Sequence, residues 1–115
     1  MKQFNQLSSL SKKEKLFLQQ SRNAIKALDP SADIILYGSR ARGDAGPESD
    51  YDLLILADDD ASLEKEDVFR RRLFPIELET GAVLTVMLVS RSDWEAPLYN
   101  CMPFCRNVKN EGVIL

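Results

Sequence analysis

The alternation of apolar and polar residues predicts a helix in the first third of the chain. Ser11 and Glu14 have the spacing of a capping box, in which each side chain accepts a hydrogen bond from the other residue's backbone N–H at a helix N-terminus. The helix is expected to continue to Leu28 and to stop at Asp29-Pro30, because a proline disfavours helical geometry in the residue before it. Its expected apolar face comprises Leu16, Phe17, Ala24, Ile25 and Leu28.

Short apolar runs predict three strands, with a second long helix between the last two. The expected strands cover residues 33–37, 50–57 and 83–89. Ser62 is placed to cap a helix over residues 63–80, and Gly81 is placed to end it. Pro75 lies inside this range, where its ring and its missing N–H are expected to kink the helix or split it in two.

Shorter helical segments complete the pattern. One helical turn is expected over residues 40–44. A short helix containing Trp94 is expected to be capped by Ser92 or Asp93, and a last helix covers residues 103–112. The order helix–strand–strand–helix–strand–helix–helix predicts an α/β (α+β) fold, in which helices pack on a small mixed β-sheet.

Composition and charge narrow the class of protein. The 115 residues fit one domain over residues 1–115, whose thin core leaves room for a partner or a second copy of the chain to cover an apolar face. The net charge of −3 argues against nucleic acid as a general partner. Because no apolar run could span a bilayer and no signal-peptide pattern is found, a cytoplasmic protein is expected. The absence of histidine excludes Ser-His-Asp and Cys-His catalysis.

Two aspartates at the start of the second expected strand suggest a metal site. Asp50 and Asp52 alternate along the strand, so their side chains share a face, whereas Tyr51 points the other way. Two neighbouring carboxylates repel each other unless a cation lies between them. Mg²⁺ suits such a pair, because it binds one or two carboxylates and leaves its other positions to water and phosphate oxygens.

Gly38 and Ser39 end the first expected strand and form a candidate phosphate-binding site. The glycine lets the backbone approach a ligand closely, Ser39 offers a hydroxyl, and the amides that follow face a helix N-terminus. Arg40 and Arg42 lie within reach of the same region and could neutralise phosphate charge. Asp44 stands where a P-loop requires lysine, so the segment is not a Walker motif. The pattern indicates metal-assisted attack on a nucleoside triphosphate.

The spacing Gly-Ser, ten residues, Asp-x-Asp resembles the signature of the DNA polymerase beta-like nucleotidyltransferase superfamily. The phrase Tyr-Gly-Ser-Arg-Ala-Arg-Gly-Asp is similar to its minimal nucleotidyltransferase branch, and the resemblance is strongest over residues 34–56. It implies a nucleotidyltransferase fold in which Ser39 grips the triphosphate, while Asp50 and Asp52 are the catalytic, metal-binding residues. In that family the metals align the α-phosphate for in-line attack by an acceptor hydroxyl, and pyrophosphate leaves.

The resemblance also implies a protein partner. Many minimal members are encoded beside a helical HEPN-domain protein and resemble antitoxins that neutralise it, some by adding AMP to it. The first hypothesis is therefore Mg²⁺-dependent transfer of AMP from ATP to a hydroxyl of such a partner. The second hypothesis is a non-catalytic protein that neutralises a HEPN-type partner by contact, with bound nucleotide at most as a structural element.

The third carboxylate that the family usually takes from a later strand is not evident in this sequence. Thr85 falls about where that acid is expected, and threonine is a poor base and a weak magnesium ligand. Glu77, Glu79 or Asp93 could substitute from outside the strand, although surface or helix-cap roles are the simpler interpretation of all three. The missing acid does not prevent nucleotide binding, but it favours the second hypothesis.

Two other groups of residues allow alternative interpretations. The run Arg70-Arg71-Arg72 is either a solvated helix face or a binding patch. The segment 94–104 is dense in large apolar side chains, which form either core or a protein interface. Neither group by itself points to a particular chemistry.

Overall fold

The chain folds into five strands and six α-helices, and the computed structural model describes all of residues 1–115. The strands are β1 (Lys2–Gln3), β2 (Asp33–Tyr37), β3 (Tyr51–Ala57), β4 (Leu84–Ser90) and β5 (Val113–Ile114). The helices are the 3-10 turn η1 (Phe4–Gln6) and the α-helices α1 (Lys12–Leu28), α2 (Ser39–Arg42), α3 (Leu63–Thr80), α4 (Arg91–Glu95), α5 (Pro97–Asn100) and α6 (Pro103–Glu111). The expected mixed α/β architecture is therefore confirmed.

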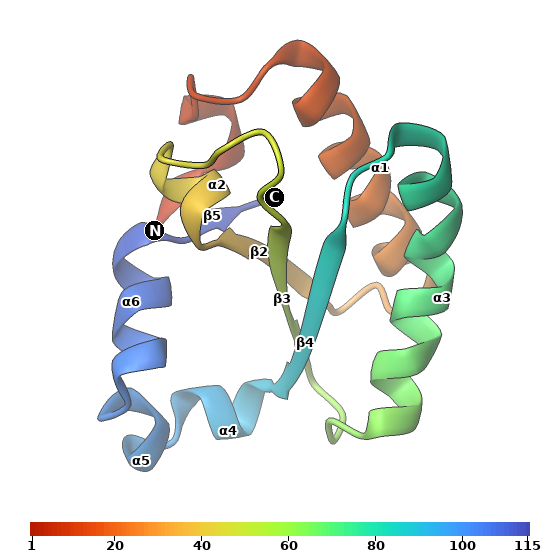
Figure 1. The fold of residues 1–115 in the computed structure, drawn as a ribbon. Coiled ribbons are helices and arrows are strands. Elements are labelled where there is room, and N and C mark those ends of the chain that lie inside the picture. The colour runs from red at the N-terminus through yellow and green to blue at the C-terminus, as the bar shows by residue number, and fades with distance from the viewer.

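The strands form one mixed sheet in the order β1-β5-β2-β3-β4. β3 runs antiparallel to β2 and parallel to β4. The upper end of the sheet is the end where β2 stops and β3 and β4 begin, and the lower end is the opposite one (Figure 1). At the upper end, Asp52 lies opposite Tyr37 on one side and opposite Thr85 on the other.

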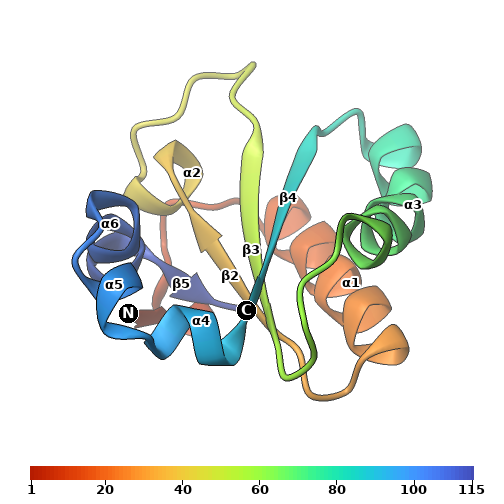
Figure 2. The ribbon, with the colours of Figure 1, turned by 90° about the horizontal axis from the view of Figure 1, so that it is seen from below.

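Helices cover both faces of the sheet, and each face has its own apolar core (Figure 2). On the first face, α1 and α3 pack against side chains that include Leu53 and Ile55 of β3. On the second face, Trp94 of α4 and Cys105 of α6 pack in the same cluster as Leu54. Because successive β3 side chains alternate between the faces, both faces of this strand are buried except near Asp52, which is half-buried on the second face.

The capping box and the extent of α1 are confirmed, but part of its expected apolar face is wrong. The Ser11 hydroxyl accepts from the Glu14 N–H, and the Glu14 carboxylate accepts from the Ser11 N–H. Leu16 is 58% exposed and Leu28 42% exposed, whereas Ile25 is fully buried. Nine residues of α-helix turn through about two and a half turns, so Leu16 and Ile25 lie on opposite sides of the helix.

α3 has the predicted ends, because Ser62 caps it and Gly81 terminates it in the left-handed conformation. Of the two expected effects of Pro75, a kink or a split of the helix, the split does not occur. The helix continues through Pro75, whose side is exposed to solvent, where the carbonyl group left without a partner can bind water. Within the run Arg70-Arg71-Arg72, Arg70 pairs with Glu66 and Arg71 pairs with Asp67. Each partner lies four residues earlier, as expected of a solvated helix face.

The cap of α4 was predicted wrongly, and two short strands, one at each end of the chain, were missed. Ser90, and neither Ser92 nor Asp93, caps α4, because the helix begins directly where β4 ends and the Ser90 hydroxyl accepts from the Asp93 N–H. Strands β1 and β5 were not predicted, since two-residue strands have no periodicity to detect. In the segment 94–104, Trp94 is buried while Leu98 is 78% exposed, so the segment is partly core and partly surface. None of the helices has the length and hydropathy needed to cross a bilayer.

Candidate active site

The corner between β2 and α2 requires a glycine. Gly38 has φ 76° and ψ −159°, a region that is accessible essentially to glycine alone. A Cβ atom at this position would lie 2.3 Å from Oδ2 of Asp52. The absence of a side chain therefore lets the Asp52 carboxylate lie directly against the backbone that leads into Ser39, the first residue of α2.

The Asp52 carboxylate is held on the other side by Thr85. The Thr85 hydroxyl donates to Oδ1 of Asp52 at 2.7 Å, as the register between β3 and β4 allows. Burial raises the pKa of Tyr37, and the negative charge of Asp52 on the neighbouring strand raises it further. The carboxylate thus sits between β2 and β4, with one oxygen bonded to Thr85 and the other facing Gly38.

Asp50 lies just before β3 and is exposed, two residues from Asp52. Neither Asp50 nor Asp52 takes part in any ion pair, since no lysine or arginine nitrogen lies within 4.0 Å of either carboxylate. Two carboxylates two residues apart at the start of β3, without a cationic partner, are available to bind a cation. The arrangement suits a site that receives a cation together with an anionic ligand.

The two arginines of α2 point away from each other. Arg40 donates to the Ser49 carbonyl at 2.9 and 3.2 Å and to the Pro47 carbonyl at 3.3 Å, so it binds the loop that carries Asp50. Arg42 pairs with Asp44 at 3.2 Å and with Glu111 at 3.1 Å. These bonds raise the pKa of Arg42, the Asp44 contact most of all. Both arginines flank the Gly38 corner, but neither contacts Asp52.

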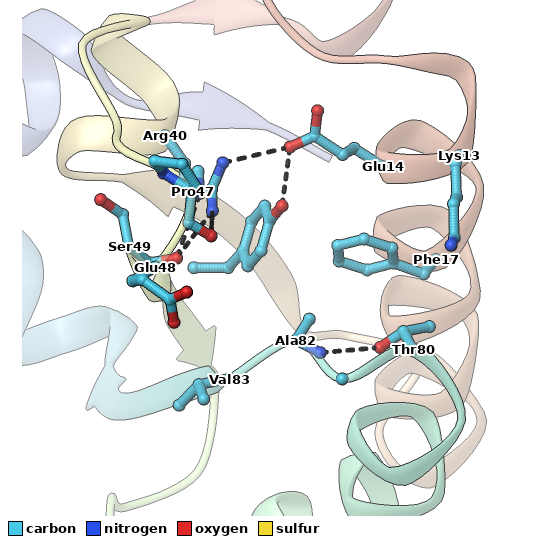
Figure 3. A pocket seen from close by; sticks show the side chains of 12 residues that line it. Lys13, Glu14, Phe17, Arg40, Pro47, Glu48, Ser49, Thr80, Ala82 and Val83 are labelled. Atoms are coloured by element: carbon cyan, nitrogen blue, oxygen red, sulfur yellow. Dashed lines mark hydrogen bonds and ion pairs between the residues drawn. The ribbon is translucent and has the colours of Figure 1, made fainter.

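A cavity of about 250 Å³ lies beside the loop 43–50, on the side of Tyr51 (Figure 3). Its wall includes Glu14 of α1, whose carboxylate accepts from the Tyr51 hydroxyl at 2.7 Å and lies 3.6 Å from Arg40. Burial, followed by the hydrogen bond to Glu14, raises the pKa of Tyr51 to about 12. Sequence reasoning recognised Glu14 only as a helix cap, because its contacts to Tyr51 and Arg40 arise from tertiary packing.

A family model for the nucleotidyltransferase domain matches residues 18–115. The chain belongs to the nucleotidyltransferase domain family. A solved structure described as a toxin–antitoxin with AMP-PNP is similar in fold, with a TM-score of 0.57 and 20% sequence identity over 84% of this chain and 69% of that chain. No curated protein matches the sequence. The resemblance carried by Gly38-Ser39 and by Asp50 and Asp52 is thus confirmed at the level of the family.

In this chain, β4 carries no acidic residue beside Asp52, and Thr85 occupies that position. The Glu77 carboxylate accepts from the Leu84 N–H at 2.9 Å, which is a structural bond at the start of β4. Asp93 lies in α4, beyond the lower end of the sheet, and Glu79 is exposed near the end of α3. The structure therefore brings none of the three alternative acids beside Asp52, and no group of three or more His, Cys, Asp or Glu side chains that could hold a metal occurs in it.

Proposed function

We propose that this chain transfers a nucleoside monophosphate, AMP, from ATP to an acceptor hydroxyl with the help of Mg²⁺. The observation that carries the proposal is the close packing of the Asp52 carboxylate against Gly38, beside a second aspartate, with neither carboxylate paired to a cation. Membership of the nucleotidyltransferase family supports the reaction class. The AMP-PNP named with the structure of similar fold supports an adenine nucleotide.

In this proposal the triphosphate binds at the start of α2, through Ser39 and the backbone N–H groups that have no partner within the helix. Asp50 and Asp52 hold Mg²⁺, and their carboxylate oxygens fit this hard cation, which takes few protein ligands when phosphate oxygens supply the rest. Arg40 and Arg42 add positive charge beside the phosphates. Thr85 keeps the Asp52 carboxylate in one orientation.

The chemistry of the proposed transfer is a substitution at the α-phosphorus. The acceptor oxygen forms a bond to the α-phosphorus, the bond from that phosphorus to the bridging oxygen breaks, and pyrophosphate leaves with the bonding electrons. The hydroxyl proton passes to water, because threonine at position 85 is too weak a base to take it. Bound Mg²⁺ would neutralise charge on the phosphate oxygens during this exchange.

We further propose that the acceptor is a side chain of a partner protein, and that the pair is a cytoplasmic toxin–antitoxin pair with a HEPN-domain toxin. The fold similarity to a toxin–antitoxin structure supports a toxin as the partner. The HEPN identity rests on the family resemblance carried by Gly38-Ser39 and by Asp50 and Asp52.

A second candidate function is neutralisation of the partner by contact, with nucleotide bound but not transferred. The position of Thr85 favours it, because this residue stands beside Asp52 where the family usually has a third acid. Binding of the triphosphate needs only the Gly38 corner and the aspartate pair, whereas activation of an acceptor needs a base as well. The two candidates therefore differ in transfer and agree on binding.

Calorimetric titration of ATP and GTP, with and without Mg²⁺, tests the shared part of both candidates. Mg²⁺-dependent binding of ATP to the wild type is expected, and it should disappear in Asp50→Asn and in Asp52→Asn. Asp60→Asn is the matched control, because Asp60 is an exposed aspartate without an ion pair near the lower end of the sheet. Binding that survives in the Asp50 and Asp52 variants would contradict the proposed site.

Labelled ATP and the partner protein then separate transfer from contact. Transfer predicts that label from the α-phosphate appears on the partner, that it is absent with Asp52→Asn, and that this variant still forms the complex but no longer neutralises the toxin. Unchanged neutralisation by Asp52→Asn, without label on the partner, would support the contact function and exclude the enzymatic one.

A further inference from the structure

Side chains from three segments that are distant in sequence meet beside loop 43–50, which carries Asp50. Arg40 comes from α2, Tyr51 from the start of β3, and Glu14 from the first turn of α1 (Figure 3). The Arg40 guanidinium lies 4.3 Å from the centre of the Tyr51 ring and 3.6 Å from a Glu14 carboxylate oxygen. The same Glu14 oxygen accepts from the Tyr51 hydroxyl at 2.7 Å. The three side chains form one connected group, which we call the Glu14–Tyr51–Arg40 clamp.

The clamp holds both chain neighbours of Asp50. On one side, two guanidinium nitrogens of Arg40 bind the Ser49 carbonyl, and one of them also binds the Pro47 carbonyl. On the other side, Tyr51 is buried, its hydroxyl is bound to Glu14, and its N–H donates to the Val83 carbonyl at 2.8 Å. Asp50 itself is exposed and has no ion pair, so its position depends on the two residues that flank it.

The Arg40 side chain is committed to this clamp. Its side chain is only 14% exposed, and all three guanidinium nitrogens have a partner among the Ser49 and Pro47 carbonyls and the Glu14 carboxylate. A direct bond from Arg40 to a phosphate would require several of these interactions to break. The planar, forked shape of the guanidinium is used to bind carbonyl groups of the loop, a geometry that a lysine ammonium cannot reproduce.

We propose that Glu14 and Arg40 are positioning residues, which fix the backbone at Asp50 so that its carboxylate and that of Asp52 receive the same divalent cation. The proposal rests on the proposed function, because it assigns the role of these two residues at the same site. Glu14 lies outside residues 18–115, the part of the chain that the family model covers. The first turn of α1 thereby becomes part of the site, in addition to capping its own helix.

The test is a titration with Mn²⁺ alone, in which metal binding is measured from the line broadening of the Asp50 and Asp52 backbone NMR signals. The Mg²⁺ dependence of ATP binding is measured as well. The variants are Glu14→Ala and Arg40→Lys. Arg91→Gln is the matched control, because Arg91 binds Asp33, Asp58 and the Ser31 carbonyl near the lower end of the sheet. Its loss removes a comparable set of bonds far from Asp50. Thermal unfolding of each variant reports the purely structural effect.

The metal concentration at half-saturation is expected to rise about tenfold in Glu14→Ala and in Arg40→Lys, as for other residues that orient metal ligands. Arg91→Gln should lower the unfolding temperature similarly but leave half-saturation unchanged. Unchanged half-saturation in both clamp variants, or an equal rise in Arg91→Gln, would overturn the proposal. Arg40→Lys also separates positioning from charge, because wild-type metal binding in this variant would mean that charge alone is needed.

Failure of the proposed function gives a different result. A wild type that binds Mn²⁺ at Asp50 and Asp52 but shows no Mg²⁺-dependent ATP binding would refute nucleotide transfer, while the clamp would still be tested by the Mn²⁺ titration. A wild type that binds neither Mn²⁺ nor ATP would refute both. If Arg40→Lys does not fold, Tyr51→Phe takes its place, because it removes only the hydroxyl bond to Glu14 and keeps the ring beneath the guanidinium.

Discussion

Aspartates lie at both ends of the central strands, but Asp33 and Asp58 at the lower end have a cationic partner, whereas Asp50 and Asp52 at the upper end have none. At the lower end, Arg91 binds Asp33 at 2.7 Å and Asp58 at 2.8 Å. At the upper end, Asp50 and Asp52 have no lysine or arginine within 4.0 Å. The fold thus neutralises Asp33 and Asp58 within the chain, whereas the carboxylates of Asp50 and Asp52 stay without an ion pair.

A second cation repeats this arrangement near the lower end. Lys65 lies 3.2 Å from Asp29 and 3.6 Å from Asp59. The hydrogen bond from Ser31 lowers the pKa of Asp29 most, burial opposes it, and the bond from Lys65 lowers the pKa further. Cationic side chains therefore neutralise Asp29, Asp33, Asp58 and Asp59 in this chain. Asp50 and Asp52 differ from these aspartates in having no such partner.

The largest expected effect comes from Gly38→Ala, which breaks the upper end directly. The backbone conformation at position 38 is strained for alanine by about 1–3 kcal/mol, and the new Cβ would lie 2.3 Å from Oδ2 of Asp52. We expect a corresponding loss in the free energy of unfolding, measured with urea, together with loss of Mg²⁺-dependent ATP binding.

Gly81→Ala is the matched control for that prediction. Gly81 also has a positive φ, 75°, but no atom lies within 4 Å of the position that its Cβ would take. The variant should therefore lose stability from backbone strain alone and bind ATP like the wild type. Equal loss of ATP binding in both variants would mean that Gly38 contributes only stability.

A smaller effect is expected from Thr85→Val, which keeps the shape of the side chain and removes its hydroxyl. Oδ1 of Asp52 would lose its 2.7 Å hydrogen bond, so the carboxylate would be free to rotate. The Mg²⁺ concentration at half-saturation of ATP binding should rise about tenfold, the lower limit of the usual effect of such outer partners. Thr85→Ser keeps the hydroxyl and should restore wild-type metal dependence, and a failure to do so would assign the effect to packing.

The sequence predicts those features of the two ends that depend only on residues close together along the chain. The caps of α3 at Ser62 and Gly81 follow from residues adjacent to the helix, and they were predicted correctly. The sequence motif likewise identifies Gly38 and Asp52, because glycine at a strand end and alternating aspartates are local patterns. Their direct contact, in contrast, depends on the antiparallel register between β2 and β3.

The features that the sequence does not predict depend on contacts between distant segments. The orientation of Arg40 is set by Tyr51 and by Glu14, and the last of these lies 37 residues before Tyr51. The sequence pattern places Leu16 on the apolar face of α1, but the side of the helix that packs against the sheet is the opposite one, so Leu16 is exposed. The two-residue strands β1 and β5 also depend on pairing between distant segments, because β5 pairs with β1 on one side and with β2 on the other.

Lys65→Met should break the lower end without changing the upper one. It removes the cation that Asp29 and Asp59 share, while keeping most of the apolar stem of the side chain. The free energy of unfolding should fall by about 1 kcal/mol, as is typical for a partly exposed ion pair that shares hydrogen bonds. Calorimetric ATP binding should keep its wild-type Mg²⁺ dependence, and a change in it would contradict the separation of the two ends.

The smallest effect is expected from the acid dependence of Glu14, which distinguishes the clamp from the metal ligands beside it. Burial raises the pKa of Glu14, but the hydrogen bonds from Ser11 and Tyr51 and the charge of Arg40 together hold this pKa below its ordinary value of 4.5. A carboxyl group with a lowered pKa in the folded state contributes stability above its unfolded pKa, and this contribution is lost as the pH falls through the folded value. The effect should be below ~1 kcal/mol, since the group is partly solvated.

Urea unfolding of the wild type and of Glu14→Gln between pH 7 and pH 3 measures this contribution. The difference in free energy of unfolding between the two proteins should be constant above pH 4.5 and should shrink below it, because the wild-type carboxyl group then becomes neutral like the amide. A difference that does not change with pH would show that the negative charge of Glu14 does not contribute, and that the variant differs only by the acceptor oxygen that its amide lacks. In that case the clamp would depend on the shape of residue 14 and not on its charge.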